Sequence, residues 1–131
     1  MNHPMLKRIH HIAIICSDYE RSKKFYTEIL ALEIVRETYR KERDSYKLDL
    51  ALDGMYQIEL FSFSNPPMRL SYPEASGLRH LAFEVENIED VAKTLTEKGI
   101  IMEPTRTDEV TKKKFIFFKD PDGLPIELYE Q

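Results

Sequence analysis

The stretch HIAIICSD (residues 11–18) decides the fold, because a second version of it, HLAFEVEN, occupies residues 80–87. His11 of the first copy aligns with His80 of the second, 69 positions later. A repeat at this spacing indicates that the chain contains two copies of one structural unit. In both copies the apolar residues alternate as in a strand, and a helical pattern follows directly.

The segments that follow each copy also correspond. Asp18, or Ser17 together with Glu20 as a capping box, is predicted to begin the first helix, and Asn87 the second. Strand-like alternation follows each helix, near residues 33–39, 45–52 and 56–63 and near 101–106, 113–119 and 124–130. The sequence therefore predicts an α+β chain of two tandem β-α-β-β-β modules (residues 6–63 and 77–131), joined by a proline-rich connector (64–76) within one domain (1–131).

Composition limits the classes of function. The chain has 131 residues, of which 42% are hydrophobic and 32% charged, and it contains no apolar run long enough to cross a bilayer. Its net charge of -4 provides no basic field for nucleic acid. We find no secretory leader and therefore expect a cytoplasmic protein. The single cysteine, Cys16, is interpreted as a small buried hydrophobe rather than a nucleophile.

Four side chains stand at equivalent places in the two copies. An IEL tripeptide follows each histidine, so that Glu59 lies 48 residues after His11 and Glu127 lies 47 residues after His80. Because strand side chains alternate, the bulkier apolar neighbours should face the helix, which leaves these histidines and glutamates on the opposite face.

A carboxylate between apolar neighbours is costly to bury unless it is paired, protonated or bound to a cation. Two imidazoles and two carboxylates on one kind of face therefore indicate a divalent metal site. The alternative is that duplication copied a structural histidine and a solvated glutamate twice, and the pattern by itself leaves both interpretations open.

At these residues the sequence resembles the vicinal-oxygen-chelate superfamily, in particular glyoxalase I-like proteins. The motifs that carry the resemblance span nearly the whole chain: HHIAIICSDYERSKKFY, YQIELFSF, GLRHLAFEVENIED and FFKDPDGLPIELYE. The resemblance implies modules that curve into a cup around one divalent metal, Zn or Ni in the first place and otherwise Co, Mn or Fe. It implies His11, Glu59, His80 and Glu127 as the metal ligands.

The resemblance also implies an activity. A metal-dependent lyase or isomerase of the glyoxalase I type would remove a proton from the carbon next to a metal-chelated carbonyl or hydroxyl of a small substrate, such as a thiol adduct. Glu127 would be the general base and Glu59 the facing partner. The positions that contact glutathione in glyoxalase I-like proteins hold Ile15 and Phe63 here, which puts that particular thiol in doubt.

Other residues are weaker candidates for substrate contacts: Phe61, Phe63, Arg69, Tyr72 and Tyr129. Strand alternation predicts that Arg79, next to His80, and His10, next to His11, face away from the site.

Three alternatives to the lyase remain at this point. Two are enzymes of the same superfamily, an extradiol-type dioxygenase using two His and one carboxylate on Fe(II), and an epimerase. The third is a non-catalytic protein that binds or sequesters a small molecule. We expect a homodimer, with the cup formed either within one chain or between chains, and we expect neither nucleic acid nor membrane as a partner.

Overall fold

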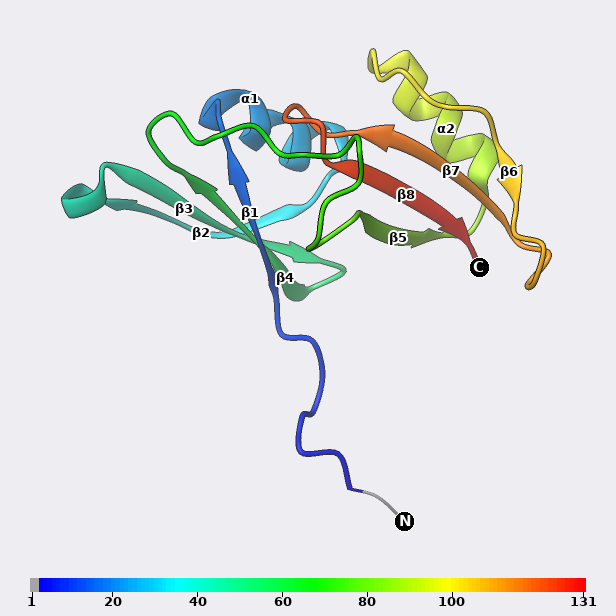
Figure 1. Ribbon diagram of the computed structural model, residues 1–131, viewed down its shortest axis with the longest axis horizontal. Coiled ribbons are helices and arrows are strands. Elements are labelled where there is room, and N and C mark those ends of the chain that lie inside the picture. The colour runs from blue at the N-terminus through cyan, green and yellow to red at the C-terminus, as the bar shows by residue number, and fades with distance from the viewer. Residues whose placement is uncertain (1–2) are drawn as a thin grey trace. The chain divides into compact units, whose positions relative to one another are not determined.

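The computed structural model describes residues 3–131, which belong to two compact units that meet in sequence between Pro66 and Pro67. The first unit contains β1 (Ile12–Cys16), α1 (Tyr19–Lys24), the π-helical turn η1 (Phe25–Ile29), β2 (Glu33–Arg40), the 3-10 turn η2 (Lys41–Arg43), β3 (Ser45–Leu52) and β4 (Met55–Ser62). The second contains β5 (Leu81–Val85), α2 (Ile88–Glu97), β6 (Arg106–Thr107), β7 (Lys114–Lys119) and β8 (Pro125–Glu130). Figure 1 shows these elements along the chain.

Both units have the same topology. The strand orders are β1-β4-β3-β2 and β5-β8-β7-β6, and in each sheet the first strand pairs in parallel with the last one, whereas the other pairs are antiparallel. This is the arrangement predicted from the internal repeat, and the predicted α+β fold class is confirmed.

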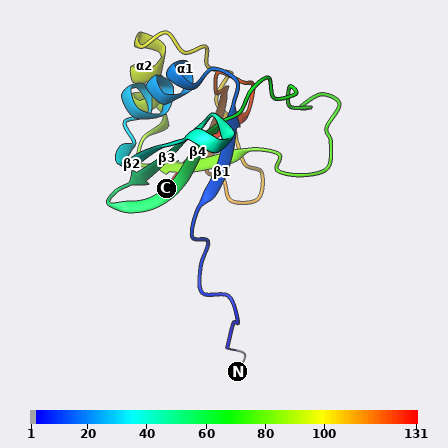
Figure 2. The ribbon, with the colours of Figure 1, turned by 90° about the vertical axis from the view of Figure 1, so that its left-hand side faces the viewer.

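Each sheet buries one face under its own helix. In the first unit the fully buried strand residues include Leu48, Leu50, Ile58 and Leu60, and α1 contacts β4. Figure 2 shows α1 on one side of the strands of this sheet. In the second unit α2 contacts β7 and β8, where Ile116, Phe118, Ile126 and Leu128 are at most 3% exposed. Each such side chain contributes roughly 1.5–3 kcal/mol to folding when it leaves water.

The helix ends follow from local chemistry. Asp18 accepts a hydrogen bond from the backbone N–H of Arg21, and Asn87 accepts one from that of Asp90, so both are N-caps as predicted. Ser17 does not cap the first helix. At the end of α2, Gly99 has φ +90°, and the N–H of Ile100 donates to the Leu95 carbonyl, which is a glycine-based helix stop.

One predicted strand is wrong over most of its length. Residues 101–105 are not in a strand, and β6 contains only Arg106 and Thr107. Pro104 has no N–H to donate to a sheet, and the backbone of this segment meets β7 through the N–H of Glu103, which donates to the Phe117 carbonyl at 2.9 Å. Arg106 is thereby placed at the edge of the second sheet.

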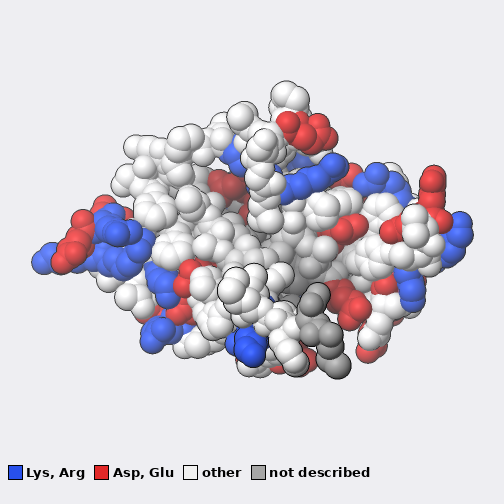
Figure 3. All heavy atoms as spheres, turned by 60° about the horizontal axis from the view of Figure 1, so that its bottom comes forward, with Lys and Arg blue, Asp and Glu red and all other residues white. Residues whose placement is uncertain are grey.

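The charged side chains are distributed without separation of the two signs on the face that is drawn. Positive and negative side chains are intermixed on the face shown in Figure 3, and both signs occur together at the β2–β3 hairpin tip, residues 41–44. No helix within residues 3–131 has the length and apolar character needed to span a membrane.

Candidate metal centre

The first of two His–Glu pairs joins the start of β1 to β4. His11 precedes β1, and Ala13, two residues later, lies opposite Glu59 in the parallel β1–β4 ladder. The Nε2 atom of His11 is 3.2 Å from Oε1 of Glu59, whose side chain is 12% exposed. The first pair therefore lies on the helix-free face of its sheet, as alternation predicted.

The second pair repeats this geometry in the second unit. His80 precedes β5, and Ala82 lies opposite Glu127 in the parallel β5–β8 ladder. The Nε2 atom of His80 is also 3.2 Å from Oε1 of its glutamate, and the Glu127 side chain is 14% exposed. The duplication has thus preserved both the register and the contact.

A charged cluster surrounds Glu59 of the first pair. The Lys47 ammonium lies 3.2 Å from Oε2 of Glu59 and 2.9 Å from Oδ1 of Asp49, which is buried and also 3.4 Å from the Tyr56 hydroxyl. Burial by itself would raise the pKa of Glu59, but hydrogen bonds from Tyr56 and Lys47 outweigh it, so that the pKa is lowered. Glu59 is therefore held as a carboxylate.

In the second unit an aromatic side chain, not a charged one, is the cross-strand neighbour of the glutamate. Phe117 lies opposite Glu127 in the β7–β8 ladder, as Asp49 lies opposite Glu59 in β3–β4. The Phe117 ring meets His80 edge-on, with ring centroids 5.1 Å apart. Glu127 has no lysine or arginine ion-pair partner among the described residues.

The residue next to each histidine of the pairs departs from the prediction. His10 and Arg79 were both expected to face away from the site. His11 and His80 stand directly before β1 and β5, whereas His10 and Arg79 lie one residue further out, where no strand pairing fixes the direction of the side chain. Nδ1 of His10 lies 2.9 Å from Nδ1 of His11, so His10 accompanies the pair instead of facing away. Arg79 lines a pocket together with Phe117.

That pocket, which we call the arginine pocket, lies within the second unit. Its lining comes from the connector, the segment before β6 and the sheet: Arg69, Leu70, Ser71, Tyr72, Glu74, Ala75, Arg79, Glu103, Arg106, Phe117 and Pro125. Of the weaker sequence candidates, Arg69 and Tyr72 line it. Arg69 donates to the carbonyls of Leu78 and Arg79 and to the Ser71 hydroxyl, so its guanidinium is occupied mainly with the backbone just before β5.

The other candidate substrate contacts lie elsewhere. The Phe61 and Phe63 rings stack at 6.0 Å in the first unit, and the Arg40 guanidinium lies 4.7 Å from the Phe61 centroid. Tyr129 donates to Asp108 at 3.1 Å at the end of β8. Cys16 is buried, and its thiol donates to the Phe61 carbonyl, as expected of a structural residue.

Sequence reasoning missed Arg40, Arg106, Lys47 and Asp49. A signal existed for the last two, because Lys47 and Asp49 alternate with Leu48 and Leu50 in a predicted strand, as Glu59 alternates with apolar residues in the next one. Arg106 stood at the end of a strand whose extent was predicted wrongly, and so its position could not be deduced.

The donor chemistry of the pairs fits a divalent transition-metal ion. Each pair presents one imidazole nitrogen and one poorly exposed carboxylate, and the buried Nδ1 of His80 has no hydrogen-bond partner among the described residues. Such nitrogen and oxygen donors suit Zn, Ni, Co, Mn or Fe. The structure groups these side chains in pairs, and no three His, Cys, Asp or Glu residues within positions 3–131 form a metal-binding cluster.

The chain is similar to known proteins along almost its whole length. The chain is 62% identical to protein YwkD of Bacillus subtilis over 127 residues, which cover 97% of this chain and 99% of YwkD. A crystal structure of a glyoxalase family protein from Enterococcus faecalis superimposes with a TM-score of 0.89 at 52% identity, covering 97% of this chain and 100% of that one.

More distant relatives include enzymes. The metallothiol transferase FosB of Staphylococcus saprophyticus is 30% identical over 129 residues (95% of this chain, 78% of FosB), and a probable lactoylglutathione lyase of Vibrio cholerae is 28% identical over 129 residues (94% and 90%). Residues 8–128 match the family model described as Glyoxalase/Bleomycin resistance protein/Dioxygenase superfamily. The chain belongs to this superfamily.

Proposed function

We propose that the protein is a divalent-metal-dependent lyase or isomerase of the glyoxalase I type. The observation that carries the proposal is the duplicated His–Glu contact, 3.2 Å in each unit, on the helix-free face of each sheet. The name of the Vibrio cholerae relative, a probable lactoylglutathione lyase, supports this class of reaction.

In this proposal His11, Glu59, His80 and Glu127 bind one ion together. Each pair supplies two donors, whereas catalytic sites for such ions use three or more protein ligands and leave a position for water or substrate. When bound, the ion would supply Lewis-acid stabilisation of negative charge on a substrate oxygen.

The two glutamates then take different roles. Glu59 is engaged by Lys47 and Tyr56, which hold it as a carboxylate. Glu127 has the His80 ring 3.2 Å away and Phe117 as its cross-strand neighbour, so its carboxylate keeps fewer competing contacts. We therefore assign Glu127 as the general base that takes the proton from the substrate carbon and returns it to the adjacent carbon.

The thiol that carries the substrate is a separate matter. Ile15 is 54% exposed on the face of Glu59, and Phe63 stacks on Phe61, so neither position offers the charged or amide contact that the glutathione-binding pattern places there. Each missing contact would cost roughly 1–3 kcal/mol in a buried site. A different thiol, or a substrate without thiol, fits these positions better.

The test is an assay of methylglyoxal with several low-molecular-weight thiols, using protein loaded with Zn, Ni, Co, Mn or Fe and protein treated with a chelator. We expect turnover, or exchange of the substrate carbon-bound proton with solvent, only in the metal-loaded samples. Loaded protein that shows neither with any thiol would contradict the proposal. Oxygen uptake with catechols by the ferrous form would favour the extradiol-type dioxygenase. Tight binding of a drug by metal-free protein would favour the non-catalytic binding protein.

A further inference from the structure

We infer that the arginine pocket is an anion-binding subsite, and that the substrate carries a carboxylate or phosphoryl group there. The inference rests on the proposed function and deepens it by naming the substrate class. All the residues that carry it belong to the second unit: Arg79, Arg106, Phe117, and the His80–Glu127 pair beside them.

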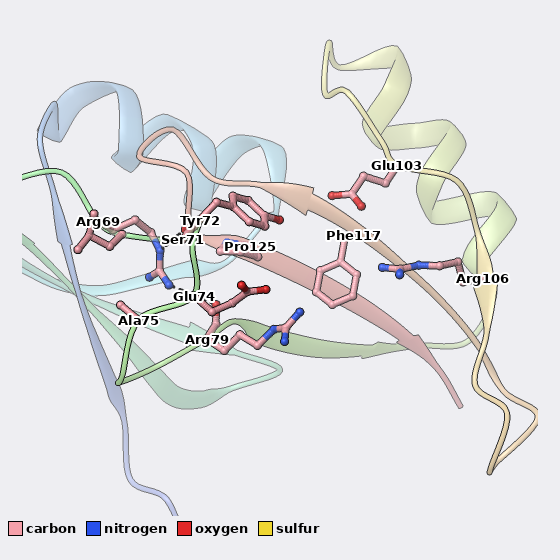
Figure 4. Close-up of a pocket in the computed structure, with 11 residues that line it drawn as sticks. Arg69, Ser71, Tyr72, Glu74, Ala75, Arg79, Glu103, Arg106, Phe117 and Pro125 are labelled. Carbon is pink, nitrogen blue, oxygen red and sulfur yellow. Dashed lines mark hydrogen bonds between the residues drawn. The ribbon is translucent and has the colours of Figure 1, made fainter.

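The two arginines converge on one aromatic ring. Figure 4 shows the side chains of Arg79 and Arg106 extending toward Phe117 from opposite sides. The Arg106 guanidinium lies 5.4 Å from the Phe117 centroid and 5.0 Å from that of Phe115. Stacking uses the face of a guanidinium and leaves its in-plane N–H donors free, which is the geometry that binds carboxylates and phosphates with two hydrogen bonds.

These donors are not consumed within the protein. Among the described residues neither Arg79 nor Arg106 forms an ion pair, whereas Arg69 donates to the carbonyls of Leu78 and Arg79 just before β5. Arg69 thereby anchors the segment that carries Arg79. Lys119, whose ammonium lies 5.7 Å from the centroid of the Tyr72 ring, adds positive charge close to the pocket lining.

Two carboxylates oppose an anion. Glu74 and Glu103 also line the pocket, and both are exposed. Three lining arginines still exceed these two glutamates by one positive charge. Arg79 and Arg106 are exposed as well, so solvent screens the attraction and the repulsion alike, and the glutamates should weaken anion binding without reversing the sign of the balance.

The pocket adjoins the proposed base. Phe117 lines the pocket, contacts the ring of His80 at 5.1 Å and lies opposite Glu127 in the β7–β8 ladder. Pro125, another lining residue, is two positions from Glu127 and therefore on the same face of β8. An anion held by Arg79 and Arg106 would leave the rest of a small substrate next to the second pair.

The test measures binding of benzoate, of its neutral analogue benzamide and of inorganic phosphate to the full chain by calorimetry, with and without metal. We expect benzoate to bind more tightly than benzamide, and Arg79→Gln and Arg106→Gln each to weaken benzoate roughly tenfold while leaving benzamide unchanged. Arg43→Gln, which removes an exposed arginine in η2, is the matched control and should change nothing. Glu74→Gln should tighten benzoate binding.

Competition by phosphate would extend the subsite to phosphoryl substrates, and lack of competition would restrict it to carboxylates. Equal binding of benzoate and benzamide, or wild-type binding by both arginine variants, would overturn the inference. The metal-free binding measurement separates the two proposals. If metal-free protein binds benzoate but metal-loaded protein shows no turnover in the methylglyoxal assay, the lyase proposal is refuted and the anion-binding subsite stands.

Discussion

The two His–Glu pairs share one contact but differ in their surroundings. In both, Nε2 of the histidine lies 3.2 Å from the glutamate, and the alanine two residues after the histidine lies opposite that glutamate. Charged Lys47 and Asp49 stand beside the first pair, whereas Phe117 and the arginine pocket stand beside the second. The comparison indicates that duplication kept the His–Glu contact, while divergence placed charged side chains beside one pair and an aromatic ring with arginines beside the other.

The largest expected effect separates the two glutamates. Glu127→Gln should lower the rate of substrate proton exchange by about 100-fold or more, because it removes the general base, while metal remains bound. Glu59→Gln should act mainly on metal affinity, since the proposed function assigns Glu59 as a ligand, and Lys47 engages its carboxylate. Exchange followed by NMR in deuterated solvent, together with metal analysis of each variant, measures both quantities. Equal loss of exchange at matched metal content would remove the distinction between the two glutamates.

A smaller effect concerns the charged cluster of the first pair. Lys47→Met leaves Asp49 and Glu59, whose side chains are 4% and 12% exposed, without the ammonium that lies between them. We expect the free energy of unfolding, measured with urea in the presence of a chelator, to fall by about 2 kcal/mol, with Arg36 compensating in part.

Lys114→Met is the matched control for that variant. It removes the same type of side chain from the ion pair with Glu89, in which both partners are about half exposed, and should leave the unfolding free energy almost unchanged. Equal effects of the two substitutions would show that Lys47 has no special role.

The smallest effect is a difference in pH and salt response. Hydrogen bonds from Lys23 and Tyr19 lower the pKa of Glu37 in the first unit, and hydrogen bonds from the backbone N–H groups of Val110 and Thr111 lower that of Asp108 in the second. Each carboxylate stabilises the fold above its ordinary pKa, and this contribution is lost as the pH falls through the lowered value.

Glu37→Gln and Asp108→Asn should therefore both flatten the acid limb of the stability profile. Added salt should weaken the contribution of Glu37, which pairs with a lysine, more than that of Asp108, which is bound mainly by neutral donors. Thermal unfolding between acid and neutral pH at two salt concentrations checks both expectations, and identical salt responses would contradict the second.

Much of the fold could be predicted from sequence because the information is local and repeated. Apolar alternation in HIAIICSD and HLAFEVEN identified the first strand of each unit and the face that meets the helix. The predicted strand at 101–106 was wrong over most of its length. Its apolar residues suggested a strand, but Pro104 has no N–H to donate to the neighbouring strand. The missing backbone N–H of Pro104 outweighed the apolar pattern of the residues before it.

For the site, sequence predicted that each histidine and the glutamate of its copy share the helix-free face of a sheet, and the structure brings each such pair to 3.2 Å. It failed at His10 and Arg79, which lie one residue further from β1 and β5 than His11 and His80 do, where no strand pairing fixes the direction of the side chain. It could not find Arg106, whose relation to Phe117 depends on how the irregular segment before β6 returns to the sheet. Contacts that depend on loop geometry leave no periodic signal in the sequence.

The central claim is that the two pairs serve one metal. Its most direct test is metal analysis of the wild-type chain and of His11→Ala and His80→Ala, after loading with Zn or Ni and removal of excess ion. We predict one ion for each complete set of His11, Glu59, His80 and Glu127, and loss of tight binding in either variant, although the substituted histidines lie in different units. Retention of stoichiometric metal by either variant would contradict the account.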